Sequence, residues 1–116
     1  MPLVRAWCSR TAPPIPAPNK WRDGRPGARV VKAFNSIGRE VMANPRFGTQ
    51  RPVLRICGDD PEACDTVAAL TEDIGFEPLR AGPLARARFV EPAALVWITS
   101  TAAMGMREFS RGLLRR

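Results

Sequence analysis

The chain has 116 residues, enough for one small domain at most, and its hydrophobic fraction of 45% permits a buried core. Its formal net charge is +7, and it contains three cysteines and no histidine. The lack of imidazole excludes histidine acid–base chemistry and histidine metal ligation. Three cysteines without a C-x-x-C spacing favour reduced thiols in a cytoplasm, so we expect neither a catalytic triad nor a metal centre.

The positive charge is concentrated at the start of the chain. Residues 1–28 contain five basic residues and one acidic residue, hence +4, and residues 29–116 contain thirteen basic and ten acidic residues, hence +3. A mildly basic folded part suits an anionic nucleotide or a weak interaction with a polyanion. It does not indicate a nucleic-acid-binding protein, because that class gathers basic residues on one face beside a recognisable module.

Residues 1–28 are predicted to form a disordered leader. They contain six of the twelve prolines, with the proline-rich run 13–18 at their centre. Proline interrupts helices and interior strands, and here prolines and arginines also break the apolar stretch that a signal peptide needs. The alternative is a proline-rich ligand for a partner domain.

A short apolar run from Val30 to Phe34 opens the second part of the chain. Its nearly continuous apolar character predicts a parallel strand covered on both faces. Asn35 and Ser36 follow, so an amide and a hydroxyl are expected just past the carboxyl end of this strand, where open α/β sheets bind ligands. The alternative is a buried strand that ends in an Asn-Ser turn. Ser36 is also the expected cap of a short helix over residues 37–43.

A strand–helix–strand unit is predicted in the middle of the chain. Residues 52–57 have the branched apolar side chains of a strand, in which Arg55 indicates an edge or a solvent-facing side. Asp60 is the expected N-cap of the next helix, and Gly75 is its expected end. Residues 76–80 form the third predicted strand.

The last third of the chain is predicted to be helical. A short helix is expected over residues 84–90, and a last one over residues 107–114. Between them, residues 92–106 form a stretch of fifteen residues without a charge. A membrane span needs about 20 apolar residues, so this stretch indicates a core or dimer helix. Arg86 and Arg88 face either an anionic group of a cofactor or simply solvent.

Several of these stretches together resemble one protein family. The run Val-Val-Lys-Ala-Phe-Asn-Ser-Ile of residues 30–37 is similar to the signature segment of the coenzyme F420-dependent NADP oxidoreductase family. Further similar stretches follow in the family's order: residues 51–60, 75–79, 81–88, 95–98 and 104–106. Family members open with a strand and a glycine-rich turn, whereas this sequence contains no G-x-G-x-x-G. The chain is therefore expected to be the carboxyl-terminal part of such an enzyme without its nucleotide-binding half.

The resemblance implies an α/β fold, with a partial Rossmann-type parallel sheet of about three strands, one β–α–β unit and carboxyl-terminal helices. It divides the chain into the leader, residues 1–28, and a truncated Rossmann-like oxidoreductase domain, residues 29–116. The implied activity is hydride transfer between NADP(H) and the deazaflavin coenzyme F420, impaired by the truncation. Relatives of the same fold serve as NADPH-binding domains of membrane ferric reductases.

The cofactor contacts implied by the matching motifs follow the first and third predicted strands: they are Asn35, Ser36, Ile37, Pro83 and Leu84. The hydride chemistry belongs to the cofactors, so no residue is expected to act as a catalytic acid or base. We also expect a cytoplasmic homo-oligomer with no membrane or nucleic-acid partner. The competing interpretation is a non-catalytic fragment that acts only as an assembly or interaction module, and a third is a small basic nucleic-acid binder.

Overall fold

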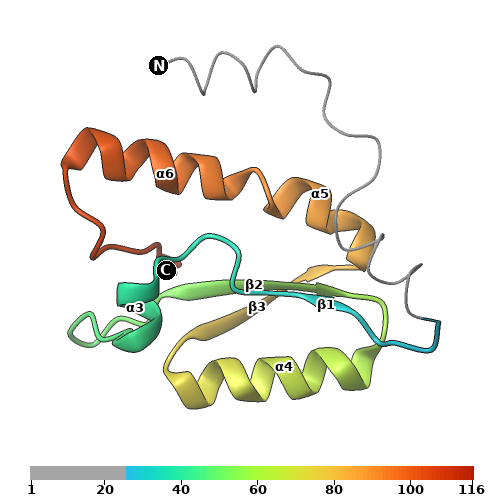
Figure 1. The fold of residues 1–116 in the computed structure, drawn as a ribbon. Helices are drawn as coiled ribbons and strands as arrows, with labels where there is room; N and C mark the ends of the chain where they lie inside the picture. The colour runs from blue at the N-terminus through green and yellow to red at the C-terminus, as the bar shows by residue number, and fades with distance from the viewer. Residues whose placement is uncertain (1–25) are drawn as a thin grey trace, which may run out of the picture.

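The computed structural model describes residues 26–116, so nearly all of the predicted leader lies outside the described residues. The described elements are, in chain order, β1 (Val31–Lys32), α3 (Arg39–Ala43), β2 (Val53–Gly58), α4 (Pro61–Ile74), β3 (Glu77–Gly82), the 3₁₀ helix η1 (Leu84–Arg86), α5 (Ala87–Val90) and α6 (Ala93–Met104). The three strands form one sheet in the order β1-β2-β3. Figure 1 shows α4 on one face of the sheet and α5 and α6 on the other. The predicted α/β class is confirmed.

The predicted strand–helix–strand unit is present as β2, α4 and β3. The two strands run parallel, with Val53 beside Glu77 at their start. The carboxylate of Asp60 caps α4 by accepting a hydrogen bond from the Ala63 backbone N–H at 2.9 Å. Gly75 ends the helix with a φ of 114°, a left-handed conformation that favours glycine. Each boundary follows from a local sequence signal.

The first strand is shorter than predicted and runs in the opposite direction. β1 pairs with β2 in antiparallel register, with Val31 opposite Gly58 and Lys32 opposite Cys57. Phe34 has a φ of 55°, which is uncommon for a bulky residue, and β1 ends before it. The prediction of a parallel strand was therefore wrong, because an apolar run indicates burial but carries no information on strand direction.

One further local prediction was wrong, and of the two alternatives for Arg55 the edge strand is excluded. Gly38, not Ser36, is the N-cap of α3, and Gly38 is buried against the ring of Trp97. Arg55 lies on β2, which is the central strand and not an edge. The Arg55 side chain is half-buried and lines a pocket beneath α5 and α6. An arginine in a strand thus indicated a solvent-facing side but not the position of the strand in the sheet.

The alternation of side chains along β2 separates two small cores. Leu54 and Ile56 point to the α4 side, where the buried residues are Val41, Leu54, Ile56, Cys64 and Phe76. On the α5 side, Cys57 packs with Ala87 and Val90. The sheet is therefore covered by apolar side chains on both faces, as a Rossmann-type sheet requires.

Residues 107–116 contact the domain without forming the predicted last helix. The backbone N–H of Val53 donates to the carbonyl of Arg111 at 2.8 Å, so the segment extends the hydrogen bonding at the start of β2. The ring of Phe109 stacks on Trp97 with 5.7 Å between centroids. Trp97 Nε1 also donates to the Phe109 carbonyl at 3.3 Å. The Phe109 carbonyl thus accepts from α6 and not from the N–H four residues later, as it would in a helix.

Helix α6 is apolar around most of its circumference. Trp97 is buried, whereas Val96, Ile98 and Met104 each leave at least half of their surface exposed. Trp97 therefore belongs to the internal packing, while the other three side chains are exposed at different positions around the helix. No helix within residues 26–116 combines the length and apolar character needed to cross a membrane.

Candidate functional site

The carboxyl ends of β2 and β3 are joined through the side chain of Asp59. Its Oδ1 accepts a hydrogen bond from the backbone N–H of Leu84 at 3.0 Å. Leu84 is 1% exposed and belongs to the packing, whereas Pro83 is exposed at the end of β3. Of these two predicted cofactor contacts, only Pro83 presents its side chain to solvent.

The side chain of Asn35 holds the segment after β1 against the junction of α5 and α6. Its Nδ2 donates to the carbonyl of Val90 at 2.7 Å and to the carbonyl of Glu91 at 3.3 Å. Ser36 is half-buried, and Ile37 packs against the core on the α4 side. The amide of Asn35 thus has a structural partner, which does not by itself exclude a cofactor contact.

The two groups of predicted site residues lie at different places along the sheet. Because β1 is antiparallel, the residues after Lys32 run beside β2 toward its amino end. Pro83 and Leu84 instead follow the carboxyl end of β3, which is parallel to β2. The two groups therefore do not both follow the carboxyl ends of parallel strands.

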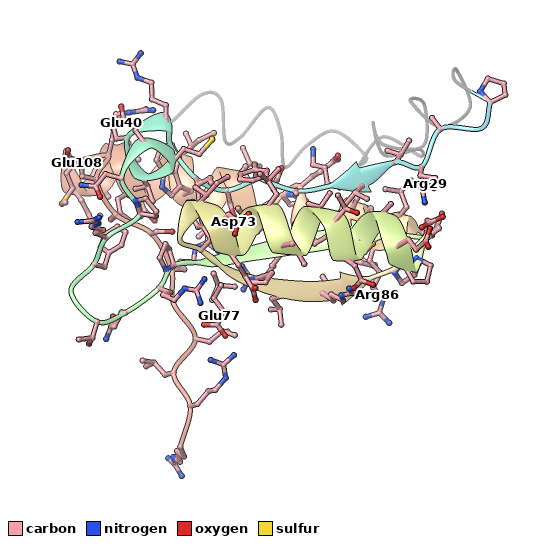
Figure 2. The ribbon with its side chains drawn as sticks, turned by 90° about the horizontal axis from the view of Figure 1, so that it is seen from below. Arg29, Glu40, Asp73, Glu77, Arg86 and Glu108 are labelled. Atoms are coloured by element: carbon pink, nitrogen blue, oxygen red, sulfur yellow. The ribbon has the colours of Figure 1, made fainter. Side chains whose placement is uncertain are left out.

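Both helix starts at this end of the sheet carry a carboxylate. Asp60 caps α4, and Asp59 binds the first backbone N–H of η1. Arg29 lies near the same helix start, with Nη1 3.7 Å from Asp60 Oδ1 and 3.0 Å from Glu62 Oε2 (Figure 2). Backbone N–H groups at a helix N-terminus commonly bind the pyrophosphate of a nucleotide. Here the carboxylates of Asp60 and Asp59 each accept a hydrogen bond from one such N–H group.

A pocket of 460 Å³ lies between the sheet and the α5–α6 layer. Three arginines from distant parts of the sequence line it, namely Arg55, Arg86 and Arg111. The sequence had indicated Arg86 as a candidate for an anionic group, but not the other two. Arg55 could have been found as a cation within an apolar strand, whereas Arg111 carried no local signal.

The two described cysteines are free and buried. Burial is the main cause that raises the pKa of the Cys57 thiol, the neighbouring Cys64 raises it further, and Arg86 opposes both. A buried thiol with a raised pKa is a poor nucleophile at neutral pH. Within residues 26–116, no three His, Cys, Asp or Glu side chains are grouped so that they could hold a metal ion.

Comparison with known proteins gives a consistent picture. No family model matches the chain. Over 71 residues the chain is 49% identical to the metalloreductase STEAP3 of Rattus norvegicus, covering 60% of this chain and 14% of that protein. A solved structure from Arthrobacter sp. FB24, provisionally assigned as an F420-dependent NADP-reductase, matches with a TM-score of 0.76 and 26% identity. The resemblance to F420-dependent NADP oxidoreductases is confirmed.

The similarity extends over most of this chain but only part of each relative. The Arthrobacter match covers 92% of this chain and 52% of the other. The hypothetical protein SMa0349 of Sinorhizobium meliloti matches with a TM-score of 0.60 and 35% identity, over 66% of this chain and 38% of the other. The chain thus spans about half the length of the first solved relative. At the level of the family, the similarity is to NADP-dependent oxidoreductases.

Proposed function

We propose that the chain is an oxidoreductase-family protein that takes part in hydride transfer between NADP(H) and a deazaflavin such as coenzyme F420. The similarity to the Arthrobacter structure over 92% of the chain carries this proposal. The cofactors supply the hydride chemistry, and the protein binds and orients them. Asn35, Ser36, Ile37, Pro83 and Leu84 are the proposed contacts, with Pro83 the most accessible of the group that follows β3.

The described residues do not fit the pyrophosphate of NADP. The sequence has no glycine-rich turn, and the carboxylates of Asp59 and Asp60 occupy the N–H groups at the two nearby helix starts. A phosphate placed there would meet negative charge instead of free donors. We therefore propose that this chain binds NADPH weakly and that its hydride-transfer activity is impaired.

Calorimetric titration of the full chain with NADPH tests the affinity, and the loss of NADPH absorbance in the presence of coenzyme F420 tests hydride transfer. We expect a dissociation constant well above the micromolar range and slow transfer. Submicromolar binding of NADPH would contradict the proposed misfit. Complete absence of transfer at saturating concentrations of both cofactors would contradict the oxidoreductase function and leave the second candidate.

The second candidate is a non-catalytic assembly module. It is supported by α6, where Val96, Ile98 and Met104 are 50–55% exposed on a helix without charged residues. Large exposed apolar side chains on an uncharged helix favour association with another protein. A second copy of the chain is the proposed partner, which makes the molecule a homo-oligomer. This proposal predicts concentration-dependent association that is independent of NADPH.

A further inference from the structure

The pocket between the sheet and the α5–α6 layer has an unusual charge distribution. Its charged lining consists of three arginines from separate segments: Arg55 from β2, Arg86 from η1 and Arg111 from the segment after α6. The remaining wall is apolar and includes Ala81, Phe89 and Ala93. None of the described residues that line the pocket is acidic.

Specific contacts hold two of the three arginines in place. Arg111 Nη2 donates to the carbonyl of Ala93 at 2.8 Å, and the Arg111 carbonyl accepts from Val53. Arg86 lies over the α-carbon of Gly82, because a Cβ built on Gly82 would be only 2.8 Å from Arg86 Cδ. The arginine stem therefore occupies space that a side chain at position 82 would fill. Figure 2 shows Arg86 beside the carboxyl end of β3.

The three guanidinium groups have no anionic partner within the described residues. Other arginines of this region do have one, since Arg80 pairs with Asp65 and Arg107 pairs with Glu40. No ion pair joins Arg55, Arg86 or Arg111 to a carboxylate of residues 26–116. Arginine remains charged in proteins, so the pocket gathers three positive charges that repel one another.

The surroundings of Arg111 show the consequence of this grouping. Burial is the main cause that lowers the pKa of its guanidinium, and the nearby charge of Arg55 lowers it further. Both influences disfavour the charged form and would be relieved by a bound anion. Replacing Arg55 with a neutral residue would remove its repulsion of Arg111.

We propose that this pocket binds a small molecule through an oxyanion, a phosphate or carboxylate group, held by Arg55, Arg86 and Arg111. Guanidinium groups match both oxyanions with paired charge-assisted hydrogen bonds. Phe89, which is 71% exposed, offers an apolar surface for the organic part of the ligand. This proposed anion site does not depend on the proposed hydride transfer, because it is argued only from the arginines that line the pocket and from their contacts.

Calorimetry on the full chain tests the proposal with two probes, inorganic phosphate and citrate, each titrated at an ionic strength kept constant with NaCl. We expect saturable binding of at least one probe, and the probe that binds distinguishes a phosphate source from a carboxylate source. At about ten times its Kd, the binding probe should also raise Tm by roughly 5–10 °C. Heats no larger than those of NaCl for both probes would overturn the proposal.

Variants connect the binding to the pocket. Arg86→Gln should weaken binding by at least about tenfold, since a charge-assisted hydrogen bond is lost, and its exposed position makes misfolding no concern. Arg116→Gln is the matched control, because Arg116 is an exposed arginine that does not line the pocket. Wild-type affinity in Arg86→Gln would refute the site, as would equal losses in both variants.

A second variant tests the repulsion among the arginines. Arg55→Met keeps an unbranched apolar stem, shorter than that of arginine, and removes the charge. It should bind the probe at least about tenfold more weakly, yet have a higher Tm than the wild type in anion-free buffer. A purely structural arginine would show a lower Tm on replacement. A lower Tm together with unchanged probe affinity would therefore contradict the assignment.

Discussion

At the scale of the residue, Gly38 shows how closely the molecule is packed around Trp97. A Cβ built on Gly38 would lie 2.9 Å from Trp97 Cζ2 and 2.8 Å from Glu40 Oε2. The φ of Gly38 is −82°, so its backbone conformation is open to any residue and the constraint is steric. The position thus requires glycine because of its neighbours and not because of its backbone.

Gly38→Ala should destabilise the protein by about 1–3 kcal/mol, the usual cost of inserting a methyl group into a packed site. Urea unfolding followed by circular dichroism measures the effect. Gly112→Ala is the control, because a Cβ there would meet its nearest atom, the Arg51 carbonyl, at an ordinary 3.8 Å. Equal stability of the two variants would show that the Trp97 ring moves aside freely.

Two carboxylates make stability dependent on acid pH. The pKa of Glu40 is lowered from its ordinary 4.5, first by a hydrogen bond to the Glu40 backbone and then by Arg107, whose Nε lies 3.1 Å from Oε1. The pKa of Glu77 is lowered mainly by a hydrogen bond from Arg115. Both groups keep more of their charge in the folded state than in the unfolded state.

Because these pKa values are depressed on folding, their contribution is complete above pH 4.5 and is lost as pH falls through the folded values. The double variant Glu40→Gln, Glu77→Gln should therefore have a Tm that depends less on pH below 4.5 than that of the wild type. Thermal unfolding monitored across this acid range makes the comparison. If Tm fell with pH to the same extent in both proteins, the proposed contribution of Glu40 and Glu77 to acid-dependent stability would be contradicted.

At the scale of the element, α4 shows which parts of the fold a local sequence signal determines. The Asp60 cap, the proline at the first helical position and the left-handed Gly75 are all short-range features, and all were predicted. The flanking parallel strands followed from their spacing around this helix. This unit was predictable because each of its boundaries depends on neighbouring residues.

Asp60→Ala should lower stability by about 1 kcal/mol, through loss of the hydrogen bond from the Ala63 N–H. Asp73→Ala is the matched control, because Asp73 is exposed near the carboxyl end of the same helix, where a negative charge is unfavourable. It should leave stability unchanged or raise it. Chemical denaturation of both variants tests the opposite signs, and equal losses in the two variants would contradict the capping role of Asp60.

The elements on either side of this unit depend on distant contacts, which explains the failed predictions. The direction of β1 is set by its pairing with β2 and by the backbone of Phe34, and an apolar run specifies neither. The last ten residues follow Trp97 and β2 instead of their own helical periodicity. The predicted crevice also assumed that both flanking strands are parallel. Asn35 instead follows the antiparallel strand β1, whereas Pro83 follows the parallel strand β3.

At the scale of the whole molecule, α6 is a helix without charged residues that exposes several large apolar side chains. The sequence indicated Pro92–Met106 as a dimer helix, but its contact residues could not be chosen without the structure. Trp97 faces inward, whereas Val96 and Ile98 are 55% and 52% exposed. The proposed self-association through α6 would therefore involve Val96 and Ile98 and not Trp97.

The double variant Val96→Glu, Ile98→Glu should shift the protein toward monomer without loss of helix content, because neither side chain belongs to the core. Sedimentation velocity over a range of protein concentrations measures the shift. Raising salt to about 1 M, where the Debye length is roughly 3 Å, should leave the wild-type assembly intact. A wild-type protein that sediments as a monomer at every concentration would refute association through α6.

Because Cys57 and Cys64 are buried, the rates at which their thiols are labelled report how often the molecule opens. Cys57 lies in the core between the sheet and α5, and Cys64 is a residue of α4 in the core between that helix and the sheet; they are 0% and 6% exposed. A thiol reagent can reach each sulfur only when the layer above it lifts, so labelling rates report the free energy of that opening. In a Cys8→Ser background, separate rates for the two thiols would show layers that open independently, and a common rate would show a domain that opens as one cooperative unit.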